Sequence, residues 1–199
     1  AVDYERAVAP LWPWLNEAAK GAQRRYLSTH GDVAEEEVRH NELLFDGGRL
    51  SHTFDGQQRT RGIQPALVDE ILSELRVARG GPLELRPQRF SAAMSLEAQV
   101  RLLRSHSIIL TGEGAVTVLA PLARPNTTWI MVYNHTRPHG EWRHSTFHAG
   151  VLRGMRHVRL LIYVIAHLER APVAELAEAA VSPFEPGVRF FGADQNGQE

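Results

Sequence analysis

Continuous apolar runs at regular intervals constrain the fold of this chain more than any other feature. Three of them are Leu43-Leu44-Phe45, Ile108-Ile109-Leu110 and the segment 129–133, Trp-Ile-Met-Val-Tyr. Strands of a parallel sheet are covered on both faces, so their sequences are continuously apolar instead of alternating. Helical patterns separate the runs, and this strand–helix order predicts parallel βαβ units with helices on both faces. The sequence therefore predicts an α/β fold built on a Rossmann-like parallel sheet.

Two of the intervening helices carry start and stop signals. Pro65 suits the first position of a helix that ends at Gly80-Gly81. Ser95 is a capping residue for a second helix, and a short strand at 83–86 separates the two. A small apolar helix at 116–123 precedes the last apolar run. The residues that the first two helices are expected to bury are Leu67, Val68, Ile71, Leu72, Leu75, Leu96, Val100, Leu102 and Leu103.

Composition divides the rest of the chain into flanking segments and one loop. Asp32 is expected to cap a helix that runs through the acidic residues Glu35, Glu36 and Glu37. Residues 46–65 are polar and rich in Gly and Arg, and they predict a long loop. The predicted segments are a helical arm at 1–41, a Rossmann-like domain at 42–170, and a C-terminal helix and polar tail at 171–199.

The charge balance and the residue types that are missing exclude several classes of function. The 199 residues include 22 Lys plus Arg and 23 Asp plus Glu, so the formal charge is -1 and gives no basis for general nucleic-acid binding. The absence of Cys excludes disulfides, a thiolate nucleophile and Cys-ligated zinc. No apolar stretch approaches the roughly 20 residues of a membrane span. No basic-then-apolar leader opens the sequence, so the expected partners include neither nucleic acid nor a spanned membrane.

A glycine turn at a strand end is the first candidate site. Gly112-Glu113-Gly114-Ala115 follows a buried strand and precedes a helix, where ligands bind in open α/β sheets. One interpretation is a phosphate or diphosphate site with backbone N–H donors. The other is a tight turn that needs Gly for its backbone angles alone.

Histidine and arginine clusters are the other candidates. His135, His139, His144 and His148 form two His-x-x-x-His pairs, and the second pair could share a zinc ion on a helix. We expect no metal site. The alternative is a metal site formed by His144 and His148. Without a metal, the cluster would form a polar or partner-facing surface. The loop arginines Arg49, Arg59 and Arg61 suit anion binding or ordinary solvation. No Gly-x-Ser-x-Gly elbow supports a hydrolase triad.

The segment Ser95-Leu96-Glu97-Ala98-Gln99-Val100-Arg101-Leu102-Leu103 is followed by Ile108-Ile109-Leu110-Thr111-Gly112-Glu113-Gly114-Ala115. Together these two segments resemble glycosyltransferase family 61. That family has a Gln-Val/Ile-x-Leu helix, an apolar strand, a His-Gly-Ala turn and a Pro before the next strand. Gln99, Gly114, Ala115 and Pro125 fall at the family's separations without a gap. Upstream, Leu43-Leu44-Phe45 with Arg49, and then Arg61-Gly62-Ile63, resemble the family's strand, basic loop and helix start; the resemblance covers about residues 42–133.

The resemblance implies a fold, a reaction and a set of site residues. It implies the donor-binding, C-terminal Rossmann half of a GT-B fold, which transfers a sugar from a nucleotide sugar to a glycan or protein acceptor. Transfer would be inverting and independent of metal, with no cofactor besides the donor. By analogy the location would be the secretory lumen, the Golgi or the endoplasmic reticulum. The implied donor-binding residues are Arg49, Arg59, Arg61, Gln99, Gly112, Gly114 and Ala115, and Glu113 would contact the sugar or act as the base.

Several polar positions of the family pattern differ in this chain. Glu113 stands where the family has His, and it puts a negative charge where a diphosphate would lie. Val116, Pro65 and Met131 stand where the family has Gly, Asn and Glu. These differences leave a second interpretation open, a catalytically inactive, glycosyltransferase-like structural subunit of a larger assembly. Its expected interface anchors are Trp12, Trp14 and Trp142.

Overall fold

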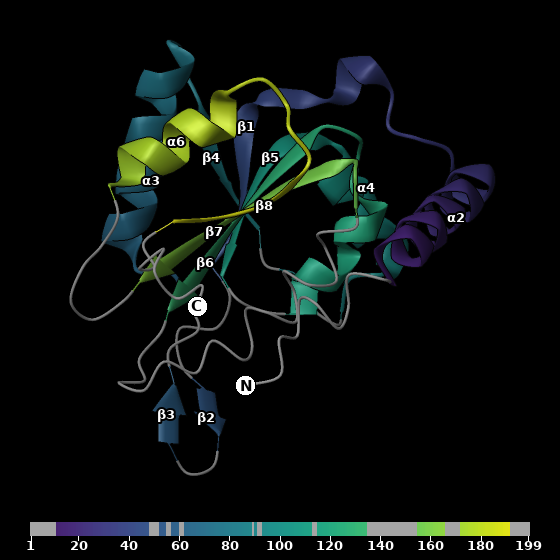
Figure 1. The fold of residues 1–199 in the computed structure, drawn as a ribbon, viewed down its shortest axis with the longest axis horizontal. Helices are drawn as coiled ribbons and strands as arrows, with labels where there is room; N and C mark the ends of the chain where they lie inside the picture. Colours follow the sequence, from purple (N-terminus) through teal and green to yellow (C-terminus); the bar gives the residue numbers. More distant parts are fainter. Residues whose placement is uncertain are drawn as a thin grey trace.

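The main sheet has six strands, all parallel, and confirms the predicted fold class. The computed structural model describes residues 11–47, 52–54, 57–59, 62–88, 90, 93–112, 115–134, 155–165 and 172–191. The strands lie in the order β4-β1-β5-β6-β7-β8 (Figure 1). Their bounds are β1 Arg39–Asp46, β4 Glu84–Pro87, β5 His106–Gly112, β6 Thr127–Asn134, β7 Val158–Ile165 and β8 Gly187–Phe191.

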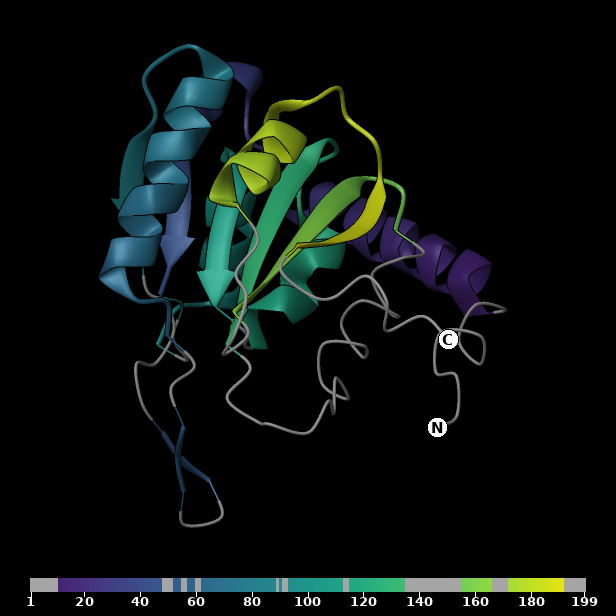
Figure 2. The same ribbon diagram turned by 60° about the vertical axis from the view of Figure 1, so that its left-hand side comes forward.

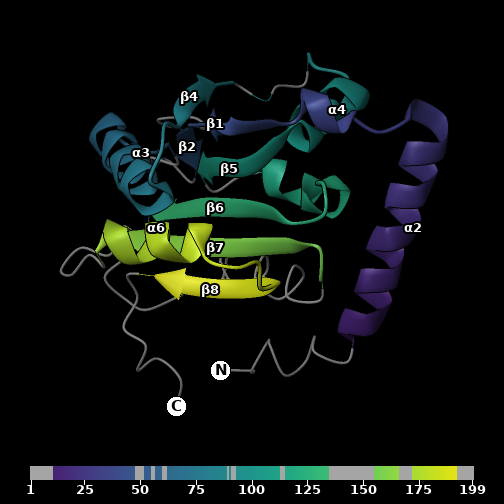
Figure 3. The same ribbon diagram turned by 90° about the horizontal axis from the view of Figure 1, so that it is seen from above.

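Helices cover both faces of this sheet. Helices α3 (Pro65–Arg79) and α6 (Val173–Val181) lie on one face and contact each other. Helix α4 (Leu96–Arg104) and the 3-10 helix η3 (Ala115–Leu122) lie on the opposite face. Helix α2 (Trp12–His30) crosses the amino ends of the strands and packs on η3 (Figure 3).

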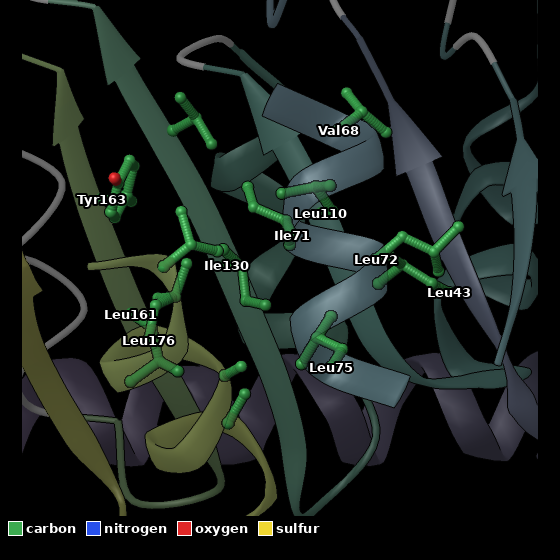
Figure 4. Close-up of a cluster of buried hydrophobic side chains, with 14 of the residues drawn as sticks. Leu43, Val68, Ile71, Leu72, Leu75, Leu110, Ile130, Leu161, Tyr163 and Leu176 are labelled. Atoms are coloured by element: carbon green, nitrogen blue, oxygen red, sulfur yellow. The ribbon is translucent and has the colours of Figure 1, made fainter. Parts of the chain in front are cut away.

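Alternate residues of each strand feed two separate cores. Leu43 and Leu110 pack under α3, whereas Leu44 and Ile109 pack in the cluster on the α4 face. All four side chains are completely buried, which explains why these strands are continuously apolar. Figure 4 shows the first core, in which Ile71, Leu72, Leu75 and Leu176 meet the side chains of β1, β5, β6 and β7.

The predicted helix signals act as expected, with one exception. Pro65 opens α3, and Gly80 ends it with a left-handed φ of 65°. The Ser95 hydroxyl caps α4 by accepting the Ala98 N–H at 3.1 Å. The five α3 residues predicted to be buried are buried, as are Val100 and Leu103. Leu96 is 58% exposed, so its predicted burial was wrong: it is the first residue of α4, and nothing in the described part of the chain covers it.

Other local predictions were wrong where long-range contacts decide the structure. Asp32 caps no helix, because its carboxylate binds the Arg104 guanidinium 72 residues away. The acidic run forms only one 3-10 turn, η2 (Glu35–Glu37). The predicted loop at 46–65 contains a hairpin of β2 (His52–Phe54) and β3 (Gln57–Arg59). The predicted polar tail contains β8, and the sheet begins at Arg39, ahead of the predicted domain start.

A buried guanidinium joins three elements at the amino edge of the sheet. Arg104, at the end of α4, is 2% exposed. It donates to the Asp32 carboxylate at 2.6 and 2.7 Å, and to the Leu122 and Ala123 carbonyls at 3.0 and 3.3 Å. The bidentate pair lowers the pKa of Asp32. One side chain thus holds the segment after α2, the end of α4 and the end of η3 together.

A second buried guanidinium lies farther along the same edge. Arg159, the second residue of β7, donates to the Thr128 hydroxyl at 3.0 Å and to the Ala180 carbonyl at 2.9 Å. It also donates to the Ser182 and Pro183 carbonyls, at 3.1 and 3.2 Å. These bonds satisfy carbonyls at the C-terminal end of α6, where the Ser182 hydroxyl also donates to the Ala179 carbonyl at 3.0 Å and the Thr128 hydroxyl to the Ala180 carbonyl at 3.4 Å.

The handedness of the connection from β7 through α6 to β8 differs from that of most parallel crossovers. The chain moves from β1 to β4 in one direction across the sheet and from β7 to β8 in the other, yet α3 and α6 cover the same face. Because all the strands are parallel, the two crossovers have opposite hands. Figure 1 shows that β1–α3–β4 is right-handed, so β7–α6–β8 is left-handed, as parallel crossovers seldom are. The Arg159 bonds anchor α6 at the point where this crossover turns back toward β8.

Replacing the buried Arg104 with Met is expected to lower the free energy of unfolding by about 2–4 kcal/mol. Methionine keeps most of the stem but removes the Arg104 donor from the Leu122 carbonyl and the ion pair from Asp32, whereas the Ala123 carbonyl keeps the Gln23 amide as a donor at 3.3 Å. The matched control is Arg101→Met, because Arg101 forms an exposed pair with Glu37 at 3.2 Å and its loss should cost less than about 1 kcal/mol. Urea denaturation measures both values, and equal losses would contradict the role assigned to Arg104.

Stability is expected to fall as the pH drops below 6.5. Burial lowers the pKa of His106, against opposing effects of the Leu102 carbonyl and the Glu42 carboxylate, and burial also lowers the pKa of His157. Since the folded pKa lies below the unfolded value of 6.5, the unfolded chain binds more protons, and stability is complete only above that pH. Urea midpoints between pH 7.5 and 5.5 should decline, and the double variant His106→Asn/His157→Asn should flatten the profile. An unchanged slope in that variant would contradict the assignment.

Candidate functional site

At the carboxyl edge of the sheet, the neighbouring strands β1 and β5 send the chain to opposite faces and in opposite directions along the sheet. Strand β1 leads to α3 on one face, and β5, its neighbour, leads to η3 on the other. Figure 2 shows these strand ends at the same edge, with the β2–β3 hairpin projecting beyond it. In open α/β sheets this divergence leaves a crevice in which ligands bind. The ends of β1 and β5 are therefore the best candidate site in the described part of the chain.

Two polar side chains, Asp46 and Thr111, lie at the ends of β1 and β5. Asp46 ends β1 and pairs in register with Thr111 on β5. Asp46 is 8% exposed and Thr111 is completely buried. The Thr111 hydroxyl accepts the Trp129 indole N–H at 2.9 Å, which orients the hydroxyl. Sequence analysis placed Asp46 only at the start of the predicted loop at 46–65, although a carboxylate directly after an apolar run was a usable signal.

The predicted glycine turn lies at the same position. Strand β5 ends at Gly112, and η3 begins at Ala115, so the turn joins the two elements next to the end of β1. This placement agrees with the expected strand–turn–helix context. Glu113 and Gly114 lie between these two residues in the sequence, outside the described residues.

The other predicted donor-binding residues are distributed around this edge. Arg59 is on β3 of the projecting hairpin, whereas Arg49 and Arg61 lie outside the described residues. Gln99 is in α4, and its side-chain amide donates to the Met94 carbonyl at 3.0 Å. That bond fixes the approach to α4, so Gln99 already has a local structural role. Gly112, Ala115 and the hairpin strand of Arg59 are the predicted positions found on the carboxyl side of the sheet.

A Ser–His–Glu arrangement at the opposite edge escaped sequence reasoning. His106 Nδ1 lies 3.0 Å from the Ser105 hydroxyl and 2.9 Å from the Leu102 carbonyl, and its Nε2 lies 3.5 Å from Glu42. A carbonyl at that distance requires a proton on Nδ1, so Nδ1 cannot accept the serine proton. The arrangement therefore braces the end of α4 and does not form a nucleophilic triad.

A groove beside α4 is lined by apolar and charged residues. Its walls include Glu36, Val38, Arg39, Met94, Ala98 and Arg101. Arg101 pairs with Glu37 at 3.2 Å, and Arg39 pairs with Glu42 at 3.1 Å. Both arginines of the lining are therefore neutralised, so no arginine of this groove is left to select an anion.

Metal-ligating groups do not converge in the described residues. No three His, Asp or Glu side chains among them are placed to share an ion. The predicted alternative ligands His144 and His148, with His135 and His139, lie outside the described residues, as do Trp12's side chain and Trp142. Among the helices that the structure describes, none has the length and apolar character needed to cross a bilayer.

No family model, curated protein or solved structure matches this chain.

The Thr111–Trp129 hydrogen bond is expected to stabilise the folded chain near the end of β5. Thr111→Val leaves a buried indole N–H without an acceptor and should lower the free energy of unfolding by about 1–3 kcal/mol. A double-mutant cycle with Trp129→Phe isolates the bond, and a coupling energy of about 1 kcal/mol is expected from urea denaturation. Strict additivity would mean that the bond does not contribute.

Proposed function

We propose that this chain is a glycosyltransferase-like domain that binds a nucleotide sugar at the carboxyl ends of β1 and β5. The observation that carries the proposal is the junction of β5, Gly112 and Ala115, which lies beside the end of β1 at the point where the connections diverge. The parallel sheet is of the class that the resemblance implies, and the turn that would hold the diphosphate lies at the edge where such sheets bind ligands.

The proposed roles follow from the chemistry of sugar transfer. Backbone N–H groups of the turn Gly112, Gly114 and Ala115 would donate to the diphosphate, and the side chains of Arg49, Arg59 and Arg61 would offset its charge. The acceptor hydroxyl oxygen attacks the anomeric carbon while the bond from that carbon to the diphosphate oxygen breaks. Glu113, or a base from another domain, takes the hydroxyl proton, and the nucleoside diphosphate leaves. Inversion at the anomeric carbon results, and no metal is required in this scheme.

A specific observation favours the second candidate function, a non-catalytic structural subunit. Trp14 is 68% exposed and Leu11 is 51% exposed, at the start of α2. Exposed tryptophan is typical of residues that anchor protein interfaces. Glu113, at the place of the family's His, also weakens the case for diphosphate binding by the natural chain.

Titration with nucleotide sugars tests the proposal. Calorimetry with UDP-glucose, UDP-N-acetylglucosamine, UDP-xylose, GDP-mannose and GDP-fucose should give saturable binding to the natural chain. Glu113→His should bind the same donor about 10-fold more tightly, because it removes a carboxylate from the diphosphate site. The matched control is Arg24→Ala on exposed α2, which should leave the affinity unchanged.

The other outcomes distinguish the two candidates. Binding only after Glu113→His would indicate a donor site that the natural chain has lost. No binding by either protein would overturn the donor-binding proposal, and the structural subunit would then be the better explanation.

A further inference from the structure

Helix α2 buries little of its surface on the rest of the chain. Among its side chains that the structure describes, only Ala19 is buried. Figure 3 shows the helix at the rim of the molecule, with the sheet on one side of it. Trp14 is 68% exposed, and Leu11, which directly precedes the helix, is 51% exposed. Large apolar side chains left exposed on one helix are typical of a surface that binds another protein.

The exposed residues of α2 follow one stripe along the helix. From Trp14, steps of four, three and four residues lead to Ala18, Gly21 and Arg25. This spacing averages about 3.5 residues, as at the contact positions of a coiled coil. Three of the four residues are exposed, and Gly21 is half-buried. Trp14 lies five residues before the buried Ala19, about 140° around the helix, so the stripe faces away from the sheet.

Glycine at position 21 is not required by the packing of the described residues. A glycine inside a helix costs about 1 kcal/mol relative to alanine. A Cβ added to Gly21 would meet only the flexible Arg25 side chain, at 3.6 Å, which is an ordinary contact distance. The small residue therefore suits the close approach of a second surface to the stripe.

Two copies of the stripe complement each other when the helices run antiparallel. In that arrangement Trp14 faces Arg25 of the second copy, and Ala18 faces Gly21. Each contact occurs twice about a twofold axis, as an isologous interface requires. The Trp14 ring would lie against a guanidinium, which is a favourable cation–π contact, and the small residues would meet near the axis.

The residues on one flank of the stripe supply opposite charges to this pairing. Glu17 and Arg24 lie on that flank, seven residues apart, so antiparallel helices bring Glu17 of one copy beside Arg24 of the other. Glu17 already contacts Lys20 at 2.7 Å, but the two side chains are 61% and 49% exposed, and such a pair contributes little. Half-buried Leu15 and Ala22 would face each other on the opposite flank.

Parallel pairing of the same stripe is unfavourable. It would place Arg25 of one copy against Arg25 of the other, and Glu17 beside Ala22 instead of Arg24. Like charges that face each other in a contact are destabilising.

We propose that α2 is a dimerisation helix, which pairs in antiparallel register with α2 of a second copy of this chain. The proposal does not depend on nucleotide binding, because α2 crosses the amino ends of the strands, at the edge opposite the candidate site (Figure 3). The contact positions are Trp14, Glu17, Ala18, Gly21, Arg24 and Arg25.

Sedimentation equilibrium of the full chain tests the proposal. The natural chain should change from monomer to dimer between about 1 and 200 μM. Trp14→Ala should weaken dimerisation by about 10-fold or more, because it removes the largest side chain of the contact. Asp69→Arg, at an exposed position on α3, is the matched control that reverses a charge elsewhere and should leave dimerisation unchanged.

A charge exchange tests the register. Glu17→Arg and Arg24→Glu should each weaken dimerisation by about 10-fold, because each places like charges at both flank contacts. The double variant Glu17→Arg/Arg24→Glu should regain the dimer, and an equimolar mixture of the two single variants should form a heterodimer. Circular dichroism and thermal unfolding identify any variant that does not fold.

Four outcomes would overturn the proposal. A natural chain that stays monomeric up to about 200 μM would show that the face does not bind a second copy. A dimer that tolerates Trp14→Ala and both charge reversals would have its interface elsewhere. Failure of the folded double variant to regain the dimer would exclude the antiparallel register. Monomers that sediment with phosphatidylserine vesicles, but not after Trp14→Ala, would assign the face to a membrane surface.

Discussion

Two buried guanidinium groups hold the amino edge of this sheet, and the arrangement of the helices depends on them. Hydrogen bonds of Arg104 link the end of α4 to the end of η3 and to the segment after α2. Hydrogen bonds of Arg159 link the start of β7 to the start of β6 and to the end of α6. Each one donates to backbone carbonyls that packing has removed from water, where an unmade hydrogen bond is costly. Both guanidinium groups therefore act at the amino edge, opposite the edge where β1 ends at Asp46 and β5 ends at Gly112.

The same physical logic decides which elements could be predicted from sequence. Leu43 and Leu44 face opposite cores, so a strand buried on both faces leaves an unambiguous apolar run. Strand β8 pairs on one side only and exposes Arg189, so its sequence carries no comparable signal. Asp32 carried a local capping signal, but its partner Arg104 is 72 residues away, and no local rule identifies that pairing. The burial of Arg104 and Arg159 could not be predicted from the sequence either, because arginine side chains are usually exposed.

The candidate site was predictable only to the extent that it follows from strand ends. Gly112 and Ala115 were located correctly because a glycine turn after a buried strand falls at the carboxyl edge of any parallel sheet. Asp46 was placed in the predicted loop at 46–65, because its position beside Thr111 arises from the pairing of β1 with β5, which no local pattern reveals. The proposed chemistry of the ligand, by contrast, comes from the family resemblance of residues 95–115.

The two outer strands of the sheet differ in their capacity to recruit additional strands. Strand β4 is four residues long, carries Glu84 and Arg86, and ends at Pro87, which has no N–H to offer a neighbour. Strand β8 is longer and ends in Phe190 and Phe191, with the Arg189 guanidinium 5.4 Å from the Phe191 ring as its main charge. Growth of the sheet by intermolecular pairing, including the pairing that leads to aggregation, is therefore opposed at β4 and resisted at β8 chiefly by one arginine.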